Sequence, residues 1–214
     1  MAGPMASIRF IHAPIRNDLK GIKQEISVIA SLGAGDMQSV AKRFAFLEEV
    51  LGGHEKAEEE AMFPAIDAKV PGASGVYEQA HRDMDALRGQ LRTALANSNS
   101  ERAYELVSEM VTKMDSHLDQ EEQELIPLFD QHLSAEEQRA LGENMQARQP
   151  REQMAVAMPW IFKNQGQEER EGFLRMMQGA MPPPAFQGIK ATAQAAVPPK
   201  EWEELAVRMP ELKA

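Results

Sequence analysis

The sequence predicts an all-α protein: an up-down-up-down four-helix bundle followed by a C-terminal helical extension. Aromatic residues make up only 6% of the 214 residues, and Ala, Glu, Gln, Met and Leu dominate, which favours helices over strands. Turn-forming clusters rich in Gly, Asp, Asn, Ser or Pro stand at residues 33–36, 71–75 and 97–100. They separate four long segments, and short turns between long helices make neighbouring helices antiparallel. A hydrophobic fraction of 43% is enough for a core.

Each of the four segments repeats core-type positions in steps of three and four residues, which is the seam of a bundle helix. The first seam is Ile8, His12, Ile15, Leu19, Ile22, Ile26 and Ile29. The second is Phe44, Leu47, Leu51, His54, Glu58 and Met62. The third is Tyr77, His81, Met84, Leu87, Leu91 and Leu95. The fourth is Val107, Met110, Met114, His117, Glu121, Leu125 and Leu128.

Further helices are predicted after the bundle. A capping box over Ser134–Glu137 indicates that one begins there. An apolar cluster around Trp160 follows, then a short helix over residues 167–177. The prolines at 182–184 break that helix, and a last short helix carries Trp202.

The chain is therefore expected to have two parts, a bundle over residues 1–133 and a helical extension over residues 134–214. Both tryptophans lie in the extension, so it has apolar surface of its own to bury. We expect the extension to pack on the bundle. The alternatives are that it covers the entrance of a site or forms a subunit interface through which the protein oligomerises.

Composition and charge exclude several classes of site. Because the chain has no cysteine, it forms no disulfide, iron–sulfur cluster, Cys-ligated zinc site or thiol nucleophile, and any metal must rest on His and carboxylate. The net charge of −10 argues against nucleic-acid binding, which needs a basic surface. No stretch approaches the ~20 apolar residues of a membrane span, and the start lacks a secretory apolar region. We expect a cytoplasmic protein with no membrane contact.

The polar residues of the seams are the candidates for function. Four of the five histidines and two glutamates occupy seam positions, and a buried carboxylate is costly unless it is paired or metal-bound. Segments two and four repeat one motif, in which Glu follows His by four residues and Pro follows His by ten. A spacing of four puts His54 beside Glu58, and His117 beside Glu121, on one helix face. Each proline is expected to bend or end its helix.

The four seam histidines also match in depth along the bundle. His12 lies about 19 residues before the first turn and His54 about 17 after it, while His81 lies about 16 before the third turn and His117 about 17 after it. At ~1.5 Å per residue, each lies about 25 Å from its turn. All six polar side chains can therefore occupy one layer.

Four imidazoles and two carboxylates suit a first-row metal such as iron, with manganese and zinc as compatible alternatives. The carboxylates can bridge two ions, and the histidines can fill terminal positions. The alternative for each histidine is a core residue satisfied by hydrogen bonds. The other acids of these helices are expected to form solvated faces; they are Glu55, Glu59, Glu60, Glu122 and Glu124.

This ligand pattern resembles that of the hemerythrin family, also called HHE cation-binding domains, and its members are His12, His54, Glu58, His81, His117 and Glu121. The resemblance covers roughly residues 5–133. It implies a four-helix bundle with a non-haem di-iron centre, in which the two glutamates and an oxo, hydroxo or water ligand bridge the irons. By the same resemblance, the histidines of the first two segments bind one iron and those of the last two bind the other.

Two departures from oxygen-carrying members bear on function. Those members have a His four residues before the third-segment His, where this chain has Tyr77. They also place the last carboxylate five residues after the final His, which would be Glu122 rather than Glu121. The spacing here is more similar to that of iron-sensing eukaryotic hemerythrin-like domains and several bacterial ones. Losing one His opens a coordination position, where Tyr77 can ligate or donate a hydrogen bond; otherwise it is a core aromatic.

Two functions follow from the resemblance. The first is a di-iron protein that binds oxygen, or senses oxygen, iron or nitric oxide. The alternative is an enzyme, an oxidoreductase that activates oxygen or decomposes hydrogen peroxide at an open coordination site near Tyr77. The segment after Pro159 also resembles the tail of hemerythrin domains in plant iron-regulating ligases.

Overall fold

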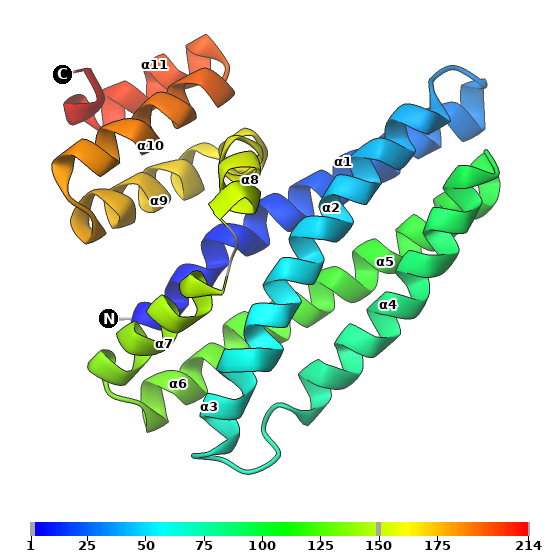
Figure 1. The fold of residues 1–214 in the computed structure, drawn as a ribbon. Coiled ribbons are helices and arrows are strands. Elements are labelled where there is room, and N and C mark those ends of the chain that lie inside the picture. Colours follow the sequence, from blue (N-terminus) through cyan, green and yellow to red (C-terminus); the bar gives the residue numbers. More distant parts are fainter. Residues whose placement is uncertain (1–2, 149–150, 214) are drawn as a thin grey trace. The chain divides into compact units, whose positions relative to one another are not determined.

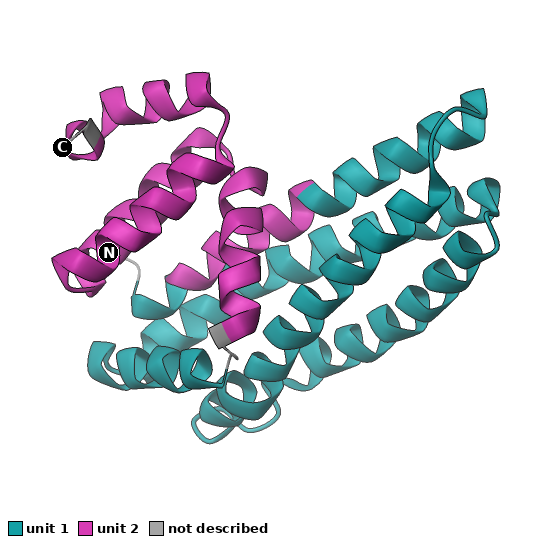
Figure 2. Ribbon diagram, turned by 45° about the horizontal axis from the view of Figure 1, so that its top comes forward, with its two compact units in different colours: residues 1–6, 18–149 teal, residues 7–17, 150–214 magenta. Residues whose placement is uncertain are grey.

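The computed structural model describes residues 3–148 and 151–213. Within these ranges the regular elements are all helical, which confirms the predicted all-α class. Contacts group the chain into two compact units, coloured separately in Figure 2. The first comprises residues 1–6 and 18–149, and the second comprises residues 7–17 and 150–214.

Four long helical stretches match the predicted segments, and they reverse direction at short turns (Figure 1). Within the first unit, α4 packs against both α2 and α5. Arg43 on α2 donates from Nε to Asp18 Oδ1 on α1 at 2.8 Å, which ties these two helices together. The stretches are α1 (Arg9–Leu32), α2 (Met37–Ala57) continued by α3 (Phe63–Asp67), α4 (Gly75–Ala96), and α5 (Ser100–Gln120) continued by α6 (Ile126–His132).

Two of these stretches contain a widened π-helical turn, η2 (Glu58–Met62) and η3 (Glu121–Leu125). The Phe63 N–H bonds the Glu58 carbonyl, and the Ile126 N–H bonds the Glu121 carbonyl, so each bond spans five residues instead of four. Each wide turn begins at a predicted ligand. The prolines Pro64 and Pro127 follow near the start of α3 and α6, and the chain stays helical through both. Of the two outcomes expected of these prolines, a bend or an end of the helix, the second does not occur.

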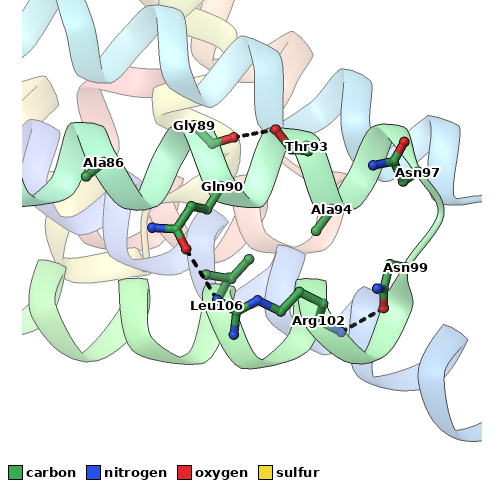
Figure 3. A pocket seen from close by; sticks show the side chains of 9 residues that line it. All are labelled: Ala86, Gly89, Gln90, Thr93, Ala94, Asn97, Asn99, Arg102 and Leu106. Atoms are coloured by element: carbon green, nitrogen blue, oxygen red, sulfur yellow. Dashed lines mark hydrogen bonds between the residues drawn. The ribbon is translucent and has the colours of Figure 1, made fainter.

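The turn between α4 and α5 is held by side chains, as Figure 3 shows. Asn99 caps α5 by accepting a hydrogen bond from the Arg102 backbone N–H at 3.0 Å, and Arg102 Nη2 donates to Gln90 Oε1 at 3.2 Å. Ser98 takes a left-handed backbone conformation with φ of 52°. A surface pocket of about 550 Å³ lies beside this turn, and its lining includes none of the predicted ligands.

Helix α7 (Ala135–Ala147) belongs to the first unit and contacts η2. The predicted capping box at its start is confirmed, with Ser134 and Glu137 bonding each other's backbone N–H. None of the helices in residues 3–148 and 151–213 combines the length and hydropathy needed to cross a lipid bilayer.

The second unit has a core of its own. Phe162, Leu174, Leu205 and Met209 are fully buried in it, and Trp202 is nearly so. The apolar surface expected of the extension is thus buried among its own helices. Its packing on the bundle stays a prediction. Its elements are the first part of α1 (residues 9–17), α8 (Arg151–Asn164), α9 (Gln167–Ala180), α10 (Pro183–Ala196), α11 (Pro199–Arg208) and the 3-10 turn η4 (Pro210–Lys213).

Candidate metal centre

The predicted ligands are buried at matching places on their helices. His54 lies in the last turn of α2 and Glu58 opens η2, while His117 and Glu121 repeat this at the end of α5 and the start of η3. His81 lies on α4. Glu58 and Glu121 are 0% exposed, which for two carboxylates demands a partner.

Four of these residues form a group within the first unit that could hold an ion. Ligand atoms of Glu58, His81, His117 and Glu121 all lie within 4.8 Å of one another. The remaining predicted ligand, His12, is fully buried and belongs to the second unit. Two carboxylates and two imidazoles in one group are donors that a first-row metal cation accepts.

The geometry around Glu58 fits a cation better than a set of hydrogen bonds. His54 Nε2 lies 3.2 Å from Glu58 Oε1, and His81 Nε2 lies 3.4 Å from Oε2. Despite these approaches, neither oxygen makes a hydrogen bond to any group in the described part of the chain. These nitrogen and oxygen atoms approach one another without forming a hydrogen bond. A cation could bind between them.

His81 and His117 face each other in the same way. Their Nε2 atoms are 3.2 Å apart and their rings meet edge to face, with centroids 4.9 Å apart. His117 Nε2 also lies 3.3 Å from Glu121 Oε1. Imidazole nitrogens and carboxylate oxygens are ligands for iron, manganese or zinc, so the residues present fit such a metal.

Comparison with known families settles what kind of domain this is. The sequence profile of the Hemerythrin HHE cation binding domain matches residues 4–129, more than half of the chain. The chain belongs to the hemerythrin HHE cation-binding family. The resemblance predicted from the ligand pattern is confirmed, and with it metal-ion binding through the His and Glu clusters.

Similarity to one curated relative extends beyond the residues that the family profile matches. The protein named "Zinc finger protein BRUTUS" from Arabidopsis thaliana is 24% identical over 192 residues, which cover 84% of this chain. That share is larger than the part matched by the family profile, so the similarity continues into the C-terminal helices. The chain spans only 15% of the relative's own length. No solved structure matches this sequence.

Burial dominates the electrostatics of this hemerythrin domain. It raises the pKa of the Glu58 carboxyl well above its usual range, and the nearby charges of Glu55 and Glu59 add to the effect. Burial likewise raises the pKa of Glu121, and the Glu58 charge adds to it. Two buried carboxyl groups whose pKa values are both raised form a site that a bound cation would stabilise in its ionised form.

Of the acids expected to form solvated faces, Glu55 departs from that expectation, and Glu59 meets it but also contacts a predicted ligand. Glu55 is buried, and Arg88 Nη2 donates to its Oε2 at 2.6 Å. Glu59 is half-exposed but reaches His81, with Oε1 2.8 Å from Nδ1. Glu60 does lie at the surface and pairs with Arg148 at 2.8 Å. Neither Glu55 nor Glu59 stands in a sequence pattern that separates it from Glu60, because all three follow His54 within six residues of a Glu-rich helix.

Tyr77 is buried on α4, one turn before His81. Its ring centroid lies 6.4 Å from that of His117 and 6.1 Å from that of Phe63. Burial, followed by the charges of Glu124 and Glu121, raises the pKa of Tyr77 to about 12. The phenol is therefore protonated at neutral pH and can donate a proton or a hydrogen bond.

Proposed function

We propose that this hemerythrin domain holds two iron ions bridged by Glu58 and Glu121 and binds dioxygen, or senses oxygen, iron or nitric oxide. The observation that carries the proposal is the convergence of two buried carboxylates and two imidazoles, whose ligand atoms lie within 4.8 Å of one another. In the proposed centre, His12 and His54 hold one ion, and His81 and His117 hold the other. Manganese or zinc would suit the same donors, so the choice of iron rests on the family.

A bound ferrous pair would supply the electrons that a diatomic ligand needs. The chain's own residues would hold the ions, set their separation and keep bulk water away. Phe63 and Met62, both fully buried, follow Glu58 in the chain, and Leu125 and Phe129 follow Glu121 in the same way. These apolar side chains favour a small uncharged ligand over an anion.

The proposal is tested by mixing the anaerobically reconstituted ferrous protein with oxygen. A visible absorption band that appears with oxygen and disappears under vacuum over repeated cycles is the expected result. A protein that takes up no iron, or that shows no spectral response to oxygen or nitric oxide, would contradict it. The variant His12→Ala provides a second test, since the proposal requires this substitution to lower the iron content.

A second candidate, an enzyme that activates oxygen or decomposes hydrogen peroxide, is favoured by the burial of Tyr77 near His117. A protonated phenol there could donate a proton to a reacting oxygen atom. We expect Tyr77→Phe to lower peroxide turnover about 100-fold or more, since a positioned proton donor typically contributes that much. Iron content should not change. Turnover that is equal in both proteins, or absent in wild type, would rule out this role.

A further inference from the structure

We propose that Glu59 is a positioning residue that fixes His81 in the tautomer whose Nε2 lone pair faces the predicted metal ligands. This inference rests on the proposed metal function and assigns a task to a residue outside the ligand set. It starts from the contact between the Glu59 carboxylate and the His81 ring.

The contact favours one position of the ring proton. Glu59 Oε1 lies 2.8 Å from His81 Nδ1, and an ionised carboxylate can only accept, so Nδ1 must be the donor. In the neutral ring, Nε2 is then left with its lone pair. That atom lies 3.4 Å from Glu58 Oε2 and 3.2 Å from His117 Nε2. The lone pair thus faces a carboxylate oxygen and a second imidazole nitrogen, where a cation would bind.

Two consecutive acids contact different nitrogen atoms of the His81 ring. Glu58 is fully buried and approaches the ring at Nε2, whereas the Glu59 side chain is 50% exposed and approaches at Nδ1. Glu59 also lines a groove of about 320 Å³ between α2 and α4, together with Glu55 and Arg88. It therefore holds the imidazole from the solvent side while Glu58 meets it from inside.

A carboxylate behind a ligating histidine restricts the rotation of the ring and makes its free nitrogen a better donor to a metal. Without Glu59, the ring can exchange its tautomers and lose the lone pair at Nε2. Removing such an outer partner typically weakens metal binding by about 10- to 100-fold.

The first measurement needs no metal. In the metal-free protein, ¹⁵N shifts of the His81 ring should report the Nδ1–H tautomer, and Glu59→Ala should shift the ring toward the Nε2–H form. Glu60→Ala is the matched control, because Glu60 is a neighbouring, similarly exposed acid that pairs with Arg148 and Lys56 instead of a histidine. An unchanged tautomer in Glu59→Ala would overturn the inference.

The second measurement is Fe²⁺ affinity by competition with a chelator under anaerobic conditions. We expect Glu59→Ala to bind Fe²⁺ about 10- to 100-fold more weakly and Glu60→Ala to match wild type. Glu59→Gln should recover part of the loss, because an amide oxygen still accepts from Nδ1. A wild-type protein that binds no Fe²⁺ would overturn the proposed function and this inference with it. Equal affinities in wild type and Glu59→Ala would overturn the inference alone.

Discussion

Replacing Glu58 with Gln is expected to remove both ions, whereas replacing His81 with Ala should remove one. In the proposed centre, Glu58 would bridge both ions, whereas His81 would hold only one of them. Iron content should therefore fall from about two per chain in wild type to about one in His81→Ala and to almost none in Glu58→Gln. The measurement is iron per chain after anaerobic reconstitution and desalting.

The same variants should also differ in how much Fe²⁺ raises their thermal stability. A ligand at 100 times its Kd stabilises the folded state by about 2.7 kcal/mol, which for a chain of this length raises Tm by roughly 5–10 °C. Wild type should show this rise on adding Fe²⁺, and Glu58→Gln should not. Glu60→Gln, which changes an exposed acid, serves as the control and should respond like wild type. A Glu58→Gln protein that loads two irons would refute the shared-ligand arrangement.

The metal-free protein is expected to lose stability as pH rises above about 4.5, the usual value for a glutamate in the unfolded chain. Burial raises the folded-state pKa of Glu58 and Glu121. Each group's contribution is thus fully present below pH 4.5 and is lost as the pH rises through its folded pKa. Metal binding has the opposite dependence, because the ligands must be deprotonated, so affinity should increase with pH.

Urea unfolding across pH 5 to 8 tests the direction of this pH dependence. Without metal, Glu58→Gln should exceed wild type in free energy of unfolding, and the difference should widen as the pH rises. With Fe²⁺ present, wild type should become the more stable protein. The surface acid Glu137 does not interfere, because hydrogen bonds from Ser134 and Lys69 lower its pKa to about 2 and place its titration below this window. A difference that is constant with pH would contradict the prediction.

The sequence was sufficient to predict the helical bundle and to place the candidate ligands on their helix faces, because both depend on simple spacing. Steps of three and four residues placed His54 beside Glu58, and equal distances from the turns placed His81 level with His117. The family match and the geometry agree with these expectations.

The roles of residues that depend on contacts between helices could not be predicted from the sequence. Glu55 and Glu59 differ from Glu60 only in what faces them from α4, namely Arg88 and His81. The wide turns escaped prediction for another reason. A seam drawn at 3.6 residues per turn assumes a regular α-helix, and so it carries no signal for a turn that spans five residues. Only Pro64 and Pro127 marked the places, and their sequence context did not distinguish a wide turn from a helix end.

The wide turns at Glu58 and Glu121 have a consequence for how the family's sequences can vary. Each acts as a one-residue insertion in an α-helix, and removing that residue would rotate all that follows by about 100°. Ile66 after the first turn, and Ile126 and Phe129 after the second, are nearly fully buried and would leave their places in the core. Insertions and deletions between the glutamate and the proline should therefore be as rare in functional relatives as changes to the ligands themselves.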